Sequence, residues 1–207
     1  MDTRTAIETM DAAALRQLLV DDPSQANALI LWGIDQRNLT HPLHYVSDVL
    51  FSDPAKRGSE PELVAALIDA GADVNFQASP RTDTPLIGAA SLGAEDVGLA
   101  LLKAGARPEL VGIFGETALH WAAHLGEVRL AAALIPCSDL NFKDEKFDGS
   151  PLDWALHGWR DPPAGNVGLQ REVVALLVGA GARVEPQMLA FEGVQADAGM
   201  LAALTGR

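Results

Sequence analysis

A short motif recurs along the chain at a fixed interval of 33 residues. Its copies begin at Thr84, Thr117 and Ser150 and read TPLIGAA, TALHWAA and SPLDWAL. A related copy, HPLHYV, begins at His41, 43 residues before the first of these. A period of this length indicates one small structural unit that is repeated and stacked, because each unit can bury its apolar face only against its neighbours.

Each motif has a physical reason. Thr or Ser at its start predicts the cap of a first helix, and Pro fits the next position because its missing N–H costs nothing there. Leucines at helical spacing predict a continuous core. A second motif ends in a Gly–Ala pair that contains Gly71, Gly105 and Gly181. Glycine there predicts the end of a second helix, because it readily takes the left-handed conformation.

The two motifs resemble those of the ankyrin-repeat family, T-P-L-H-x-A-A and L-L-x-x-G-A-D-x-N, over most of the chain. The resemblance implies an all-α solenoid of about five helix–turn–helix repeats with short hairpin-like fingers. The expected single domain, 1–207, has repeats near 3–30, 36–77, 78–111, 112–143 and 144–185 and a C-terminal cap over 186–207. The run from Asp144 to Trp159 is similar to the terminal repeats of some bacterial ankyrin proteins.

Two of the expected repeats are longer than 33 residues. The additional residues fall between their helices, over 51–61 and 158–166, where the density of Pro and Gly predicts loops. The finger over 31–38 is also long and carries Trp32, which is expected to be exposed. Insertions in a solenoid lie on one face and often contribute to binding, although neutral surface insertions are common too.

The resemblance also implies a binding surface, because fingers and first helices line the concave groove of ankyrin proteins. The matching first-helix positions are Asp48, Ser91, His124 and His157. The finger positions are Arg37, Asn38, Arg81, Asp83, Phe114, Glu116, Lys146 and Phe147, and Trp159 joins them from the second insertion. Aromatic residues and arginine among charged groups are typical of interfaces.

A second set of equivalent positions forms an aromatic series of Tyr45, Trp121 and Trp154, with Gly88 as its gap. These rings either fill the seam between helix layers or, with a hollow at Gly88, form a pocket for a small apolar ligand. His44 and His120 occupy the motif position whose side chain links neighbouring loops in the family.

His124 and His157 are candidates for a chemical role. With a nearby carboxylate they would suit a metal site or a general acid–base pair. The sequence contains no P-loop, HExxH or CxxC motif, and no catalytic residue, metal or cofactor is predicted. Whether the protein is an enzyme therefore stays open.

The net charge of −13 makes nucleic acid an unexpected partner, because an acidic surface repels phosphates. The single cysteine, Cys137, excludes an internal disulfide, no apolar run is long enough for a membrane span, and the N-terminal residues lack the apolar core of a signal peptide. These features favour a cytoplasmic protein, and a capped solenoid is typically a monomer.

Two functions follow from the sequence. The first is a protein-interaction module that binds a partner protein through its groove and insertions. The alternative is a small-molecule or metal-binding protein, or an enzyme, with its site around His124, His157 and the Trp121/Trp154 pair. The identity of the partner is not encoded in the motifs, since groove positions diverge freely among ankyrin proteins.

Overall fold

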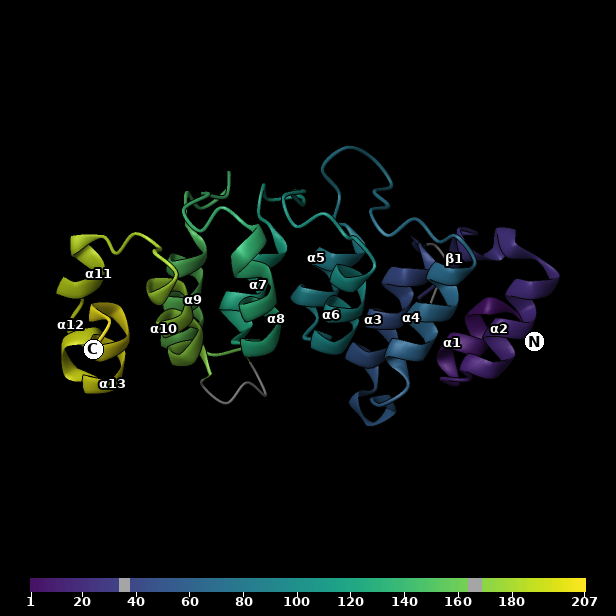
Figure 1. The fold of residues 1–207 in the computed structure, drawn as a ribbon, viewed down its shortest axis with the longest axis horizontal. Coiled ribbons are helices and arrows are strands. Elements are labelled where there is room, and N and C mark those ends of the chain that lie inside the picture. Colours follow the sequence, from purple (N-terminus) through teal and green to yellow (C-terminus); the bar gives the residue numbers. More distant parts are fainter. Residues whose placement is uncertain (34–37, 164–168) are drawn as a thin grey trace. The chain divides into compact units, whose positions relative to one another are not determined.

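The computed structural model describes residues 1–33, 38–163 and 169–207, which form two compact units, Met1–Arg107 and Pro108–Arg207 (Figure 1). Regular structure in both units is mostly helical. Among the described residues, no helix is both long and apolar enough to cross a membrane. The predicted finger residue Arg37 and the end of the second predicted insertion lie outside the described residues.

The first unit consists of paired helices in two rows (Figure 1). First helices α1, α3 and α5 pack in one row, and second helices α2, α4 and α6 pack in the other. Their bounds are α1 Thr3–Glu8, α2 Ala12–Asp21, α3 Pro42–Ser52, α4 Glu60–Asp69, α5 Pro85–Ser91 and α6 Glu95–Lys103. Fully buried leucines such as Leu43, Leu63 and Leu101 lie within these rows.

Two short strands interrupt the helical pattern of this unit, where the sequence predicts only a long finger. Strands β1 (Ile30–Trp32) and β2 (Asn38–Thr40) pair antiparallel, with Leu31 opposite Leu39. Trp32 is half-buried rather than exposed, and its ring lies 6.4 Å from that of Tyr45.

The second unit repeats the same arrangement. Helix α7 (Ala118–Leu125) packs on α9 (Pro151–Arg160), and α8 (Val128–Leu134) packs on α10 (Gln170–Gly179). Three short helices follow: α11 Pro186–Ala190, α12 Glu192–Ala196 and α13 Ala198–Thr205. Helix α13 packs against α10 and covers its outer side.

The motif residues act at helix ends as the sequence predicts. Thr84 and Ser150 cap α5 and α9 through their side chains. Gly71, Gly105 and Gly181 follow α4, α6 and α10 with φ values of 89°, 90° and 99°. The asparagine of the second motif links one turn to the next: Asn75 Oδ1 accepts from Arg107 N at 2.8 Å, and Asn141 Oδ1 accepts from Arg183 N at 2.8 Å. These bonds explain the Asn at that motif position, because they satisfy backbone N–H groups of the next turn.

The helices that flank the two predicted insertions extend into them, so the described loop segments are shorter than the sequence indicates. Helix α3 continues to Ser52, a 3₁₀ turn covers Pro54–Lys56, and α4 already begins at Glu60. Helix α9 continues to Arg160, so Trp159 lies on a helix. Gly158 does not break that helix, which ends beside Asp161 and Pro162, because the residue before a proline is disfavoured in helical conformation.

Gly158 instead permits close contact between α9 and α7. A Cβ atom at this position would lie 2.0 Å from the backbone oxygen of His124. Any larger residue would push the two helices apart, because a backbone carbonyl cannot rotate away as a side chain can. The packing of α7 on α9 therefore depends on this glycine.

We expect Gly158→Ala to lower the free energy of unfolding by about 1–3 kcal/mol through steric overlap with α7. Gly179→Ala in α10 is the matched control, because a Cβ there meets nothing within 4 Å. Alanine at that helical position should leave stability unchanged or raise it by up to about 1 kcal/mol. Urea unfolding of both variants measures the difference, and equal effects would contradict the close-contact explanation.

Candidate functional site

The second unit contains a cavity of about 510 Å³ whose walls are mainly aromatic. We call it the aromatic cavity; it is lined by Phe114, Trp121, His124, Lys146, Phe147, Asp148, Gly149, Asp153, Trp154 and His157. These residues come from α7 and α9 and from the turns that precede them. The cavity thus combines five predicted groove residues with both tryptophans of the alternative pocket.

Two buried carboxylates hold the tryptophans in place. Glu116 is fully buried; its Oε1 accepts from Trp121 Nε1 at 3.0 Å, and its Oε2 accepts from Phe114 N at 2.8 Å. Asp144, which is 2% exposed, accepts from Trp154 Nε1 at 3.0 Å. Each indole is therefore oriented by a carboxylate behind it, on the side away from solvent.

Asp144 also organises the turn that precedes α9. Its carboxylate accepts from the backbone N–H groups of Lys146, Phe147 and Gly149 at 3.0, 2.7 and 3.0 Å. Burial acts to raise the pKa of Asp144, but the hydrogen bonds from Trp154, Phe147 and Gly149 outweigh it and lower the pKa below its ordinary value. The group is a carboxylate at neutral pH.

The aromatic rings meet mostly edge to face. Trp121 and Trp154 have ring centroids 4.9 Å apart and an interplanar angle of 81°. Phe147 lies 5.9 Å from Trp154, and Phe114 lies 6.2 Å from Phe147. Edge-to-face pairs leave part of each negatively polarised ring face open toward the cavity.

A lysine of the protein itself lies on these rings. Lys146 Nζ is 3.9 Å from the centroid of Phe114 and 5.1 Å from that of Phe147. Both distances are within the range of cation–π attraction. Lys146 and Phe147 are exposed, so this part of the cavity is accessible from solvent.

The two predicted histidines, His124 and His157, lie side by side, with ring centroids 5.4 Å apart. His124 is half-buried, and its Nδ1 lies 3.4 Å from the carbonyl oxygen of Trp154. Burial lowers the pKa of His124, the Trp154 carbonyl opposes this shift, and the charge of His157 adds to it. His124 is therefore neutral at pH 7. Within the described part of the chain, no group of three or more His, Cys, Asp or Glu side chains could hold a metal ion.

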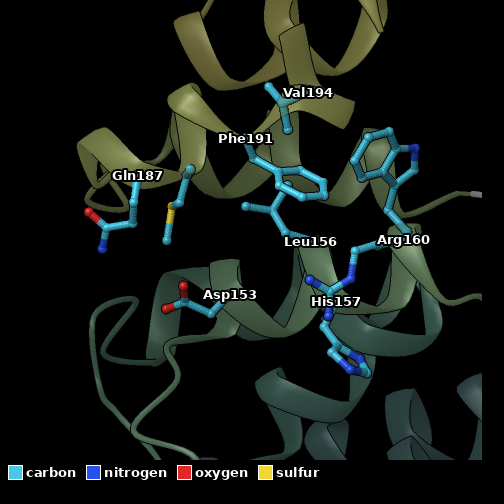
Figure 2. A pocket seen from close by; sticks show the side chains of 9 residues that line it. Asp153, Leu156, His157, Arg160, Gln187, Phe191 and Val194 are labelled. Carbon is cyan, nitrogen blue, oxygen red and sulfur yellow. The ribbon is translucent and has the colours of Figure 1, made fainter. Parts of the chain in front are cut away.

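A second cavity of about 280 Å³ adjoins the first along α9 (Figure 2). We call it the C-terminal cavity; it is lined by Asp153, Leu156, His157, Trp159, Arg160, Gln187, Met188, Phe191 and Val194. Figure 2 shows Phe191 and Val194 from the C-terminal segment facing Leu156 and Arg160 of α9. Arg160 Cζ lies 5.9 Å from the centroid of Phe191. Asp153 and His157 line both cavities, which places the predicted residue Trp159 in the same region.

The other predicted site residues lie in the first unit. Asp48 and Tyr45 line a cavity of about 280 Å³ together with Trp32 and Glu8. Burial raises the pKa of Asp48 to about 6, and a hydrogen bond from Thr40 opposes this shift. The other predicted residues of this unit are Asn38, which pairs with Trp32, and Arg81, Asp83 and Ser91. A groove that runs through both units stays a prediction.

At Gly88, the position of the alternative hollow, the structure places a side chain of a neighbouring helix. A Cβ atom on Gly88 would lie 2.7 Å from Nδ1 of His44, so the histidine ring occupies this space. Gly88 is explained by the packing of α5 on α3 and not by a ligand.

His120 has the linking role expected for the motif histidine. Its Nδ1 accepts from Thr117 N at 3.1 Å, and its Nε2 donates to Gly149 O at 3.2 Å, which fixes the neutral Nε2–H tautomer. Burial lowers the pKa of His120 to about 4, although the Gly149 carbonyl and Asp144 oppose this shift. His120 therefore connects the start of α7 to the turn that contains Asp144.

Sequence reasoning did not identify Asp144, Asp148, Gly149, Asp153, Arg160 or Phe191 as site residues. The only sequence signal for most of them was the unusual run from Asp144 to Trp159. Asp153 takes the place in its motif that His44 and His120 occupy in theirs. It accepts from N and Oγ of Ser150, at 2.9 and 2.7 Å, within its own helix.

The comparisons with known proteins agree with the motifs. Residues 114–145 match the family model described as ankyrin repeat. This match confirms the resemblance to the ankyrin-repeat family and covers α7, α8 and one wall of the aromatic cavity. A search of curated proteins found no match.

We expect the stability of the protein to depend on the protonation of His120. In the unfolded chain a histidine binds a proton near pH 6.5, whereas folded His120 resists protonation down to about pH 4. Stability is therefore lost as pH falls from 6.5 toward 4. His120→Gln, which retains one donor and one acceptor, should remove on the order of 1–2 kcal/mol of the loss between pH 7 and pH 5.

Urea unfolding at the two pH values measures this change. The original protein, measured at the same two pH values, is the reference. An unchanged pH dependence in His120→Gln would show that this ring does not titrate between the folded and unfolded states as proposed.

Proposed function

We propose that this chain, which carries an ankyrin repeat, binds a partner protein by holding a segment of it in the aromatic cavity and the adjoining C-terminal cavity. Ankyrin repeats generally mediate protein–protein interaction. The observation that carries the proposal is the cluster of tryptophan, phenylalanine and lysine side chains around one cavity in the second unit.

The composition and exposure of the cavity support this proposal. Aromatic residues are the side chains most enriched in the energetic centres of protein interfaces. Phe147 is 61% exposed, and Phe191 at the C-terminal cavity is 41% exposed. Large apolar side chains in contact with water gain free energy when a partner covers them. Asp153, His157 and Arg160 supply polar groups at the edges of the same region.

The tryptophans are held rigidly before any partner arrives. Their indole N–H groups are fixed by Glu116 and Asp144, and their rings contact one another. A preformed surface loses little side-chain entropy on binding, so more of the contact energy contributes to affinity. This rigidity favours recognition by a fixed wall over recognition by a flexible loop.

A small molecule is the second candidate ligand. The volume of about 510 Å³ is in the range of small-molecule sites, and the walls combine aromatic faces with a few polar groups. The open rim formed by Lys146 and Phe147 favours the protein segment as the primary ligand. A thermal-shift screen of metabolites against the purified chain separates the two, because only the small-molecule function predicts a large stabilisation without a partner.

The proposal extends to the repeat organisation. We infer five repeats and a cap, from the helix pairs α1/α2, α3/α4, α5/α6, α7/α8 and α9/α10 followed by α11 to α13. We also propose that the first-unit residues Asp48, Arg81, Asp83 and Ser91 contact the partner protein. Loss of partner affinity in Arg81→Glu supports this part, and unchanged affinity contradicts it.

We expect Phe147→Ala to weaken partner binding at least tenfold, because truncation of an interface aromatic costs about 1–2 kcal/mol or more. Phe51→Ala is the matched control, since Phe51 is 64% exposed and lies in the first unit. Affinity capture with the full chain identifies the partner, and calorimetry with the purified partner measures both variants. Equal affinities for the two variants would contradict a site at the aromatic cavity.

A further inference from the structure

We propose that the aromatic cavity recognises an organic ammonium group, and that Lys146 is a built-in occupant which the incoming cation displaces. The inference rests on the proposed function, since it names the chemistry of the ligand at the same site. It covers a lysine side chain of a partner protein and a free small ammonium compound, which share this chemistry.

The position of Lys146 is the first support. Its ammonium group lies on the faces of Phe114 and Phe147, at 3.9 and 5.1 Å from the ring centroids. Lys146 is exposed, so its ammonium group has bulk water available as an alternative. Its location on the rings indicates that the cavity rim attracts an ammonium group through the ring quadrupoles.

The two buried carboxylates are the second, independent support. Glu116 and Asp144 each accept the indole N–H of a cavity tryptophan. Among the residues that the structure describes, neither carboxylate forms an ion pair with lysine or arginine. Their negative charges therefore act on the cavity through a medium with little water, where electrostatic interactions are strong.

The hydrogen bonds also change the rings themselves. An indole that donates to a carboxylate gains electron density, which makes its π face more attractive to a cation. Trp is already the best aromatic partner for cations. Trp121 and Trp154 lie edge to face at 4.9 Å, and both line the aromatic cavity. Together with Phe114 and Phe147 they supply four aromatic rings to the lining of that cavity.

The remaining lining residues of the aromatic cavity also favour a cation over an anion. Asp153 adds a carboxylate to the cavity wall, Asp148 adds one that pairs with Lys143 at 3.3 Å, and burial keeps His124 neutral by lowering its pKa. Lys146 is the single lysine or arginine among the lining residues. An anionic ligand would meet carboxylates and π faces, so a cation is the favoured charge.

The test uses choline as the probe, with its neutral isostere 3,3-dimethylbutan-1-ol as the matched ligand. Two-dimensional NMR of the full chain follows the indole Nε1–H signals of Trp121 and Trp154, with that of Trp32 in the first unit as the internal reference. We expect choline to shift the first two signals with millimolar affinity and the neutral alcohol to bind at least several-fold more weakly. Equal affinities for the two ligands would overturn the proposal.

Variants separate the roles of the residues. Lys146→Met retains the length of the side chain but removes the competing charge, so choline should bind about two- to five-fold more tightly. Phe147→Leu retains an apolar side chain without a π face and should weaken binding by a similar factor, whereas Phe51→Leu in the first unit should not. Weaker or unchanged binding in Lys146→Met would contradict the displacement of Lys146.

Peptides distinguish the two sources of the ammonium group. A short peptide with one lysine is compared with butylammonium and with the same peptide carrying norleucine. If the lysine peptide binds more tightly than butylammonium and than the norleucine peptide, the natural ligand is a lysine of a partner protein. If the lysine peptide binds no more tightly than butylammonium, the natural ligand is a free small ammonium compound. If all ammonium probes fail while Phe147→Ala still weakens partner binding, the ammonium inference is wrong and the proposed protein-binding function stands.

Discussion

The carboxylate of Asp144 is the group on which the arrangement of the second unit's cavity depends. Four N–H donors converge on it: three from the backbone of the turn before α9 and one from the indole of Trp154. The turn is closed by Asp148, whose φ of 52° is tolerated by Asp more readily than by most residues. His120 then bonds the carbonyl of Gly149 in the same turn, so the start of α7 is connected to it as well. One buried charge thus sets the positions of Lys146, Phe147 and Trp154 together.

Burial of Glu116 and Asp144 has an energetic cost that the N–H donors offset. An unpaired carboxylate in the interior would cost several kcal/mol, on the order of the whole stability of a small domain. The donors are dipoles rather than charges, so each carboxylate is satisfied without being neutralised. The field of both groups is consequently retained at the tryptophans. A salt bridge at the same position would have cancelled much of that potential in the cavity.

Much of the fold could be predicted from the sequence, but the shape of the site could not. Helix starts at Thr84 and Ser150 and helix ends at Gly71, Gly105 and Gly181 follow from local chemistry, and the structure agrees. Gly158 was assigned to a loop and the role of Gly88 stayed open, because both glycines are explained by tertiary contacts, with His124 and His44. Phe114, Phe147 and the tryptophans were assigned to separate hypotheses for the same reason. These residues line one cavity because of the turns before α7 and α9, and no local motif encodes the geometry of those turns.

Helix α9 explains why the two cavities of the second unit form one region. Asp153, His157 and Arg160 recur at helical spacing and therefore lie along one side of the helix. Asp153 contributes to the wall of both cavities and also forms the capping box of α9 with Ser150. The Asp153 side chain thus both stabilises the start of α9 and lines the two cavities. Since the helix is pressed on α7 through Gly158, this wall cannot shift without loss of packing. A ligand of such a site has to fit the existing surface, because the side chains that form it are fixed by packing and by hydrogen bonds to buried groups.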